Sequence, residues 1–242
     1  MGLRYVISDI HGEYELFLAL LDKIKFTDND TLYVCGDIVE KGKNSIRLSK
    51  FISQMQNAKC IVGNHEYAFL KYYWGLMRNW GITQHLAPVS NSSTDFDDVL
   101  EKLQGYFPDD GHLLDWELVD WFEALPYYIE EDDFVCVHAG VPLDNDGKIF
   151  PLEHTIPEQL VYDRTFKEKN VGADVDKCVF FGHTPTSYLA PGDSKILAYL
   201  RPQRKGDKIS DYYKVHLDLG AWISKTLGCF CIETCECIYV KK

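Results

Sequence analysis

The chain has 242 residues, of which 46% are hydrophobic and 14% aromatic, so it has enough apolar material for one large core. It carries 25 Lys and Arg residues against 37 Asp and Glu residues, which gives a formal net charge of -12 at pH 7. Because nucleic-acid backbones are bound mainly by clustered Lys and Arg, this acidity argues against a general nucleic-acid binder, but it does not exclude a small phosphate ligand held by metal ions.

Apolar strands and amphipathic helices alternate through the first third of the chain. In the first two helices, apolar side chains recur at i, i+3, i+4 and i+7, which is the spacing of one buried helix face. A strand–helix–strand order within about 60 residues is typical of an α/β fold with parallel strands. The expected strands are 4–8, 31–35 and 58–62, and the expected helices are 13–24, 44–56 and about 66–80.

Residues 81–125 break this alternation. The stretch APVSNSSTDFDD is polar and rich in turn-forming residues, and it precedes segments of helical pattern that carry large aromatic side chains. We interpret the region from about 67 to 133 as an inserted helical cap on a single domain that covers 1–242. The remaining expected elements are a hairpin of 127–130 with 134–138, strands at 178–181 and 214–217, and a final hairpin within 225–240.

No stretch of the sequence approaches the roughly 18–20 consecutive apolar residues that a membrane helix needs. The first residues, MGLRYVISDIHG, contain a strand-like run instead of the longer apolar segment of a signal peptide. Eight cysteines without a secretion signal are most simply interpreted as reduced thiols. The sequence therefore predicts a soluble, cytoplasmic protein with neither a membrane nor a nucleic acid among its partners.

Polar side chains with metal-binding chemistry follow the carboxyl ends of successive apolar strands. In open α/β sheets, ligands bind in the crevice beyond those ends. Carboxylates, imidazoles and an amide oxygen form a mixed O/N ligand set, which suits Mn, Fe or Zn, and the number of ligands suits two ions. A structural zinc site would typically offer cysteine pairs instead. The residues concerned are Asp9 and His11, Asp37, Asn64 and His65, His138, and His183.

Five blocks, SDIHGEY, GDIVEKG, GNHE, VHAGV and FGHTP, contain these residues in chain order. Together they resemble the signature blocks of the phosphoprotein phosphatase branch of the calcineurin-like metallophosphoesterases. Within that family, the chain looks most like the compact bacterial and bacteriophage serine/threonine phosphatases and their relatives that cleave diadenosine tetraphosphate. The match covers roughly 4–66 and 134–221. The resemblance implies an α/β fold in which helices flank a two-sheet β-sandwich.

Carried over residue by residue, the resemblance also implies two divalent metal ions as cofactors. Mn is the metal that we expect, with Fe and Zn as alternatives. The first ion would be held by Asp9, His11 and Asp37, and the second by Asp37, Asn64, His138 and His183, with Asp37 as the bridge.

The expected mechanism follows from these charges. Two ions about 3.5–4 Å apart lower the pKa of a bridging water, so that hydroxide attacks phosphorus near neutral pH. His65 neighbours a predicted ligand and would protonate the departing oxygen as general acid, with Glu40 orienting its imidazole. Arg164, in VYDRTF, matches a phosphate-clamping arginine of similar enzymes.

The block GDIVEKG departs from the family's usual GDxVDRG at Glu40 and Lys41. Lysine carries a compact charge and lacks the planar fork with which arginine grips two phosphate oxygens. In addition, Val62 precedes GNHE, where the phage-type enzymes carry a further arginine. We therefore expect a weaker cationic clamp than in these relatives, with the metals and Arg164 carrying most of the phosphate binding.

These features predict a metal-dependent phosphoester hydrolase. The first hypothesis is a phosphomonoesterase of the serine/threonine protein phosphatase type, acting on phosphorylated protein. The first alternative is a nucleotide hydrolase that cleaves diadenosine tetraphosphate. The second alternative is an inactive regulator that binds metal or phosphoprotein, although the complete ligand set and His65 speak against it.

Three further features have two interpretations each. His216 either touches the site or is a satisfied sheet histidine. The basic stretch YLRPQRKGDK at 199–208 is either a solvated turn or an overhang that attracts phosphorylated substrates. The four cysteines of CFCIETCEC could bind zinc, but a two-residue turn at Glu233–Thr234 would point the two pairs to opposite sides of the hairpin.

Overall fold

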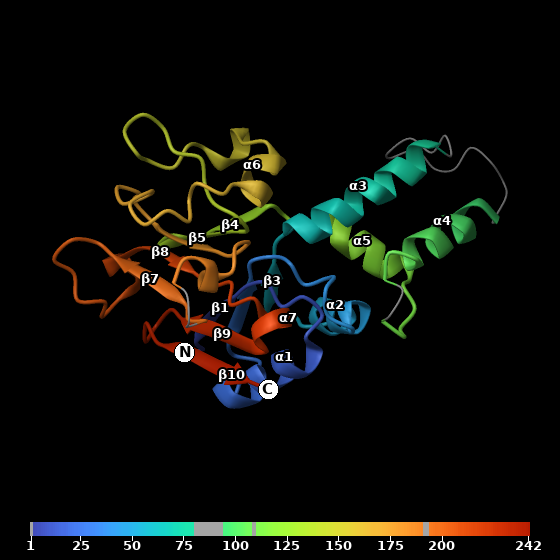
Figure 1. Ribbon diagram of the computed structural model, residues 1–242, viewed down its shortest axis with the longest axis horizontal. Coiled ribbons are helices and arrows are strands. Elements are labelled where there is room, and N and C mark those ends of the chain that lie inside the picture. The colour runs from blue at the N-terminus through green and yellow to red at the C-terminus, as the bar shows by residue number, and fades with distance from the viewer. Residues whose placement is uncertain (1, 80–93, 108–109, 191–193) are drawn as a thin grey trace.

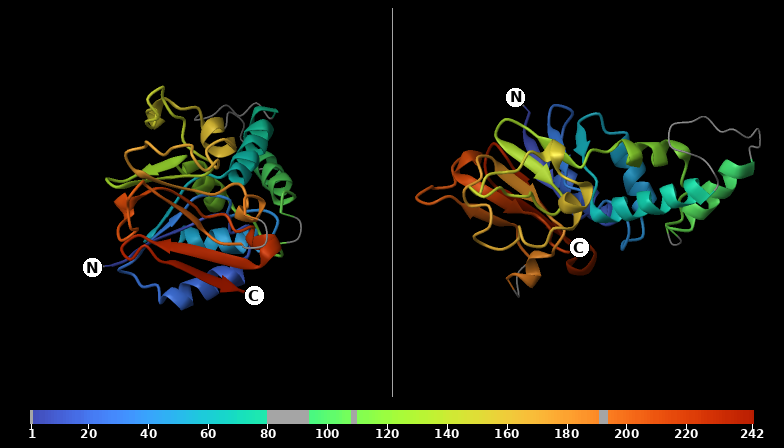
Figure 2. Two further views of the ribbon diagram at one scale, coloured as in Figure 1. Left: turned by 60° about the vertical axis from the view of Figure 1, so that its left-hand side comes forward. Right: turned by 90° about the horizontal axis from the view of Figure 1, so that it is seen from above.

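The computed structural model describes residues 2–79, 94–107, 110–190 and 194–242. In this part of the chain, two five-stranded β-sheets lie face to face, and helices pack against the outer side of the first sheet (Figures 1 and 2). This confirms the two-sheet fold that the resemblance implies. No helix of the described part is both long enough and apolar enough to cross a lipid bilayer.

The first sheet has the strand order β10-β9-β1-β2-β3. Its three N-terminal strands run parallel, as the alternating pattern predicts, while β9 and β10 are antiparallel neighbours added at one edge. The strands are β1 (Arg4–Ile7), β2 (Thr31–Val34), β3 (Ala58–Cys60), β9 (Thr226–Cys231) and β10 (Cys237–Lys241).

Two amphipathic helices connect the parallel strands and cover the outer face of this sheet. α1 (Tyr14–Ile24) buries Phe17 and Leu20. α2 (Ser45–Ser53) buries Ile52 on the same side. Both apolar faces join side chains of β1, β2 and β9 in one cluster, so the predicted helices and their buried faces are confirmed.

The second sheet has the strand order β4-β5-β6-β8-β7. β4 and β5 form the predicted hairpin, β5, β6 and β8 run parallel, and β7 pairs antiparallel with β8. The strands are β4 (Tyr128–Glu130), β5 (Phe134–Val137), β6 (Cys178–Phe181), β7 (Leu197–Leu200) and β8 (Tyr212–His216).

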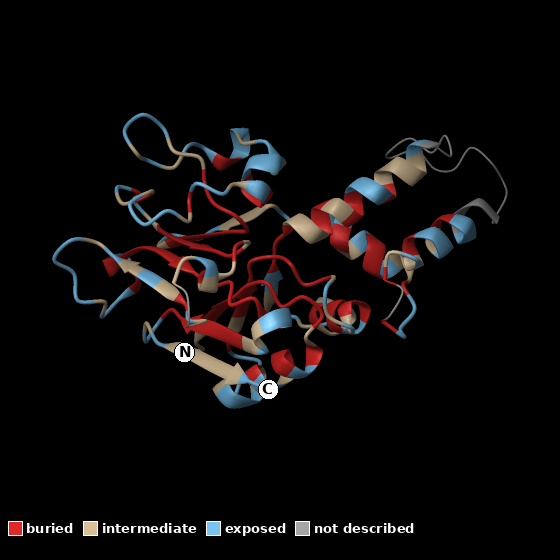
Figure 3. Ribbon diagram, viewed as in Figure 1, coloured by how far each residue is buried: buried red, intermediate tan, exposed pale blue. Residues whose placement is uncertain are grey.

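Successive side chains of a strand alternate between two layers of core. In β5, Phe134 and Cys136 point into the space between the sheets, whereas Val135 and Val137 point to the outer face of the second sheet. Phe230 of β9 enters the same inner layer from the first sheet. Figure 3 shows the buried centre of the sandwich that results.

Three helices project from one end of the sandwich, on the right of Figure 1, and bury an apolar cluster of their own. Phe69 and Phe122 belong to this cluster, with ring centroids 5.4 Å apart. The helices agree with the insertion expected between about 67 and 133, of which 80–93 and 108–109 lie outside the described residues. Treating the whole chain as one domain stays a prediction. The three helices are α3 (Asn64–Asn79), α4 (Thr94–Gln104) and α5 (Trp116–Ala124).

The basic stretch at 199–208 lies away from the carboxyl ends of the parallel strands. The basic stretch 199–208 begins with the last two residues of β7 and then connects β7 to β8. Because β8 runs parallel to β5 and β6, this connection lies at the end of the sheet opposite to their carboxyl ends, which contradicts an overhang above those ends.

Several short elements besides β7 were not expected from the sequence. They are α6 (Pro157–Tyr162), α7 (Ala221–Ser224) and the 3-10 turns η1 (Leu152–His154), η2 (Thr186–Tyr188) and η3 (Ile209–Asp211).

The C-terminal hairpin has the register that a two-residue turn predicts, with Cys229 opposite Ile238. Cys229 and Cys231 pack into the core beneath α1, whereas Cys235 and Cys237 pack against the core between the sheets. No cysteine belongs to a candidate metal-binding group in the described part of the chain. The four sulfurs therefore do not converge on a zinc ion.

Candidate metal centre and acid–base pair

The loops that follow β1, β2, β5 and β6 meet the start of α3, which follows β3, at one end of the sandwich, and together they carry the predicted site residues other than Arg164. Of the ten non-glycine residues with positive φ in the described part of the chain, six belong to this set. A left-handed backbone is costly for residues other than glycine, and it is concentrated at functional sites where the surrounding structure enforces it. The six residues are Asp9, His11, Asp37, Glu40, Lys41 and His183.

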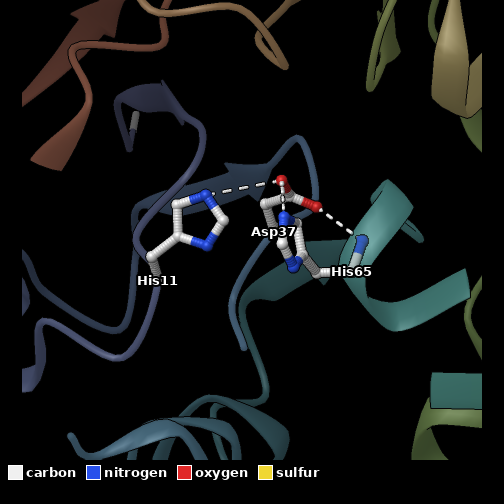
Figure 4. Close-up of side chains that lie close together, drawn as sticks. All are labelled: His11, Asp37 and His65. Atoms are coloured by element: carbon white, nitrogen blue, oxygen red, sulfur yellow. Dashed lines mark hydrogen bonds and ion pairs between the residues drawn. The ribbon is translucent and has the colours of Figure 1, made fainter. Parts of the chain in front are cut away.

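Asp37 lies at the centre of the site and is buried. Its Oδ2 is 3.5 Å from His11 Nε2 and 3.8 Å from His65 Nε2 (Figure 4), and its Oδ1 is 3.5 Å from His138 Nε2. Two groups of potential ligand atoms, each within 4.8 Å of one another, share this carboxylate. One group includes His11 and His65, and the other includes Asp9 and His138. This geometry would let Asp37 contact two cations at once.

Backbone carbonyls fix the orientation of two of the imidazoles. His11 Nδ1 lies 3.0 Å from the Val39 carbonyl oxygen, and His138 Nδ1 lies 2.8 Å from that of Cys35. Since a carbonyl oxygen only accepts, each Nδ1 carries the proton, and each Nε2 presents a lone pair toward Asp37. Burial lowers the pKa of both imidazoles, that of His11 to about 4, so both are neutral at pH 7.

Asn64 and His183 lie on the other side of His138. The Asn64 Oδ1 is 2.9 Å from His138 Nε2 and 2.7 Å from His183 Nδ1. The α3 helix begins at Asn64, two residues earlier than the sequence pattern predicts, so Asn64 and His65 lie in its first turn. The early start of the helix therefore places an amide and an imidazole side by side at the site.

His65 and Glu40 form a hydrogen-bonded pair beside this cluster. His65 Nδ1 donates to Glu40 Oε2, and His65 Nε2 points toward Asp37. Burial lowers the pKa of His65, but the hydrogen bond to Glu40 and the charge of Asp37 outweigh burial and raise the pKa above its ordinary value. A raised pKa favours the protonated form, which a general acid requires.

The two predicted phosphate-binding side chains lie near different predicted metal ligands. Lys41 Nζ is 3.1 Å from His11 Nε2 and 5.4 Å from the ring centroid of Trp222. Arg164 is exposed. Burial is the main cause that lowers the pKa of His183 to about 3, and the charge of Arg164 adds to this effect. The structure thus brings both cations to the rim of the cluster.

One family model matches most of the chain, that of the calcineurin-like phosphoesterases, over residues 4–217. The chain belongs to the calcineurin-like phosphoesterase family. The expected membership is confirmed.

The curated relatives that match this chain are named as tetraphosphatases. The symmetrical bis(5'-nucleosyl)-tetraphosphatases of Salmonella paratyphi C and Salmonella typhimurium are 29% and 30% identical to it over 141 and 139 residues. Each match includes 57% of this chain and 43% of the relative, so the chain spans less than half the length of these curated relatives.

Two solved structures share the fold of this phosphoesterase. A crystal structure described provisionally as that of a diadenosine tetraphosphatase covers 99% of this chain and 93% of its own, with a TM-score of 0.66 at 17% identity. A protein serine/threonine phosphatase of Saccharomyces cerevisiae covers 100% of this chain and 80% of its own, with a TM-score of 0.54 at 14% identity. At these identities, the likeness shows the fold alone.

Glu66 has a structural role in the phosphoesterase site that the GNHE block did not reveal. Its carboxylate is fully buried and holds the loop after β2 against the turn after β3. An added Cβ on Gly63 would lie 2.3 Å from the Asp37 nitrogen, so only glycine fits this approach. The Glu66 carboxylate accepts hydrogen bonds from the backbone N–H groups of Asp37, Ile38, Val39 and Gly63, at 2.8, 2.8, 3.0 and 2.8 Å.

Asp218 is a second residue without an expected role. It follows β8 in the segment DLGA, is buried, and lies beside Asp9 from the other sheet. Burial, followed by the charges of Asp218 and Asp37, holds the pKa of Asp9 well above its ordinary value. The segment resembles the family's final block, and this resemblance was the available signal for Asp218.

His216 is a sheet histidine and not a candidate ligand. Its ring is buried and stacks on Phe181 with centroids 4.4 Å apart. Burial lowers the pKa of His216 to about 3. Neither candidate metal-binding group in the described part of the chain includes it.

Three observations show that the residues of this site fit cations. Because His138 Nδ1 carries the proton, His138 Nε2 and the Asn64 oxygen face each other as two acceptors, which a cation would relieve. Burial and neighbouring carboxylates disfavour the charge on Asp9, and a cation would favour it. His183 Nε2 is buried without a hydrogen-bond partner among the described residues.

Proposed function

We propose that this chain hydrolyses phosphoesters with a dinuclear metal centre built on Asp37. The observation that carries this proposal is that two groups of candidate ligand atoms share the Asp37 carboxylate. Mn is the proposed metal, with Fe and Zn as alternatives, because the ligands are oxygen and nitrogen atoms. As the family resemblance implies, Asp9, His11 and Asp37 would hold the first ion, and Asp37, Asn64, His138 and His183 the second. This division differs from the two geometric groups, in which His65 accompanies His11 and Asp9 accompanies His138.

When bound, the two ions would activate the attacking water and neutralise charge on the phosphoryl oxygens. His65 would donate the proton on Nε2 to the leaving oxygen, while Glu40 accepts a hydrogen bond from Nδ1 and keeps the ring in place. Arg164 and Lys41 would bind the phosphoryl oxygens that do not react.

For the substrate, we propose a phosphomonoester of an alcohol, as in phosphoserine or phosphothreonine of a protein. An alkoxide is a strong base and leaves slowly unless it receives a proton. The paired His65 and Glu40 provide such a proton donor, with the pKa of His65 raised. The presence of this pair is therefore easiest to explain by a poor leaving group.

A dinucleoside tetraphosphate is the second candidate substrate. The observation in its favour is the name of the curated relatives, which are symmetrical tetraphosphatases. Its leaving group is a nucleotide phosphate, whose second pKa is about 6, so it can depart without a proton from the protein. The two candidates thus differ in how much they need His65.

The test is a comparison of wild type and His65→Asn with Mn²⁺ on three substrates: a phosphoserine peptide, p-nitrophenyl phosphate and diadenosine tetraphosphate. For a phosphoserine peptide, we expect kcat to fall by about 10²–10⁴-fold in the variant, the usual contribution of a general acid. For p-nitrophenyl phosphate, whose leaving group is a weak base, we expect a much smaller fall. His154→Asn is the matched control, because His154 is exposed and lies outside the site.

The outcomes separate the alternatives. If wild type cleaves diadenosine tetraphosphate but not the peptide, the second candidate replaces the first. If the peptide and p-nitrophenyl phosphate lose activity equally in His65→Asn, the role of general acid is wrong. If wild type with both metals bound cleaves none of the three substrates, the hydrolase proposal fails in favour of a binding protein.

A further inference from the structure

Lys214 lies in β8 with its side chain fully buried, which is rare for a lysine. Its ammonium donates three hydrogen bonds, which is the maximum number for this group. The acceptors are the backbone carbonyl oxygens of Phe166, Glu168 and Val171, at 2.7, 2.6 and 2.9 Å. One lysine therefore fixes three carbonyls of a single loop.

Aromatic rings surround the same ammonium and favour its charged form. Burial lowers the pKa of Lys214 to about 8, while the negative charge of Glu168 opposes this shift. The ammonium therefore remains charged at pH 7. The distances from Nζ to the ring centroids are 5.0 Å for Tyr199, 5.1 Å for Phe166, 5.6 Å for Tyr213 and 6.0 Å for Phe181.

The loop that Lys214 holds, residues 163–171, has neither a helix nor a strand to fix its shape. Phe166 anchors it by packing against Gly140 of a neighbouring loop and against Gly172, which directly follows the loop. An added Cβ on Gly140 would lie 2.3 Å from Phe166 Cβ, and one on Gly172 would lie 2.8 Å from Phe166 Cε2. The conformation of the loop therefore depends on the buried Phe166 ring and on the buried Lys214 ammonium, which lie in contact with each other.

Arg164 lies within this loop, two residues before that anchor. Asp163 Oδ1 accepts from the N–H groups of Thr165 and Phe166, at 2.7 and 2.8 Å, and so fixes the turn around Arg164. Immediately before the turn, the ring of Tyr162 lies 6.3 Å from that of His183. The anchored loop therefore presents Arg164 next to the site.

We propose that Lys214 is a positioning residue for phosphate binding: its buried ammonium holds the 163–171 loop in the conformation that presents Arg164 to the substrate phosphate. This inference rests on the proposed function. Without the ammonium, three carbonyl oxygens lose their donor, and the loop must rearrange to reach water. Arg164 moves with the loop because its turn is tied to Phe166.

The first test compares Lys214→Met, Arg164→Ala and the double variant, each loaded with Mn²⁺. Met keeps most of the side-chain volume and removes the donor. We expect KM for p-nitrophenyl phosphate and the Kd of inorganic phosphate, measured by calorimetry, to rise about tenfold in Lys214→Met, with kcat changed less than about threefold. Arg164→Ala should lower kcat/KM by at least about tenfold, because Lys214 acts through Arg164, and the double variant should be no worse than Arg164→Ala alone.

Lys169→Met is the matched control, because Lys169 lies in the same loop, carries the same charge and is exposed. It should leave KM and the phosphate Kd within about twofold of wild type. As a second readout, Lys214→Ala should regain phosphate affinity when methylammonium is added, because a small cation can then enter the vacated cage. Trimethylamine oxide, a neutral solute, should not restore it.

The inference is overturned if folded Lys214→Met binds phosphate like wild type, or if its effect multiplies with that of Arg164→Ala. If neither Lys214→Met nor Lys214→Ala with methylammonium folds, Lys214 serves folding and the inference is also overturned. The phosphate Kd is measured without turnover. An inactive wild type would therefore refute the proposed function while the calorimetry still tests Lys214.

Discussion

Asp37 is a buried carboxylate at a strand end that nevertheless stays ionised. Burial raises its pKa, but the positive charges that His138, His11 and His65 carry when protonated outweigh burial and leave the pKa well below its ordinary value. The backbone N–H of His65 adds a hydrogen bond to Oδ1 at 3.0 Å. At pH 7, where His11 and His138 are neutral, this hydrogen bond and His65, whose pKa is raised, partly offset the cost of removing the carboxylate from water before any cation binds.

Lys41 stands where the family usually has arginine, and its ammonium lies beside His11 and over Trp222. If it binds phosphate, Lys41→Ala should raise KM for p-nitrophenyl phosphate about tenfold, the effect of one lost charge-assisted contact. Lys41→Arg should lower KM below that of wild type, because the guanidinium can bind two oxygens at once. Steady-state kinetics at constant ionic strength measures both changes.

The control for Lys41 is Lys43→Ala, an exposed lysine two residues along the chain. Lys43→Ala also removes one positive charge, but not the one at the predicted phosphate contact, so it should leave KM unchanged. Equal KM values for Lys41→Ala, Lys43→Ala and wild type would show that Lys41 is only a surface residue in a variant block.

At the scale of elements, the projecting helices reach the acid–base pair through Tyr106, which follows α4. Burial and the hydrogen bond to Glu40 raise the pKa of Tyr106. Burial also raises the pKa of Glu40, but the hydrogen bonds from His65 and Tyr106 outweigh it and lower that pKa. The Tyr106 ring packs on Phe69 and Tyr72 of α3, at 5.4 and 5.9 Å. The position of the helices is thus linked to the orientation of His65.

Removal of the Tyr106 hydroxyl should therefore weaken proton donation without disturbing the aromatic packing. In Tyr106→Phe, we expect kcat for a phosphoserine peptide to fall about threefold to tenfold, the effect of one hydrogen bond. The rate for p-nitrophenyl phosphate should stay within about twofold, because that leaving group needs less help. Tyr72→Phe, in the same aromatic layer, is the control and should leave both rates unchanged.

The sequence predicts the strand ends well, because chemistry and periodicity coincide there. Asp9, Asp37, His138 and His183 each follow a short apolar run, and parallel strands bring such positions to one edge. The structure confirms that they converge, while their roles as ligands stay predictions. The register of the C-terminal hairpin could also be predicted, since alternation alone decides which side each cysteine faces.

Contacts between distant segments could not be predicted in this way. The pairing of Asp218 with Asp9 joins two different sheets, and the bond from Tyr106 to Glu40 joins the helical projection to a strand loop. Neither pairing has a periodicity or a fixed spacing in the sequence. The helix α6 has six residues, which is too short for a helical repeat to be visible.

At the scale of the whole molecule, the candidate metal centre lies across the seam between the two sheets. Asp9, His11 and Asp37 come from loops of the first sheet, whereas His138 and His183 come from loops of the second. Bound ions would therefore cross-link the two halves of the sandwich. Binding at this place is coupled to the stability of the whole fold, because ligands from both sheets must be present together.

Removal of metal should accordingly lower the melting temperature. At a free Mn²⁺ concentration of about 100 Kd, binding to the folded state alone contributes about 2.7 kcal/mol. For a chain of this length, we expect chelation to lower Tm by about 5–10 °C and Mn²⁺ to restore it, as measured by calorimetry. Asp37→Asn should lose the Mn²⁺-dependent shift, because it removes the carboxylate that both ligand groups share. Asp176→Asn, an exposed acid in an ion pair with Lys148, is the control and should keep the shift. An unchanged Mn²⁺ shift in Asp37→Asn would mean that the ions stabilise the protein from another place and that the seam is not their site.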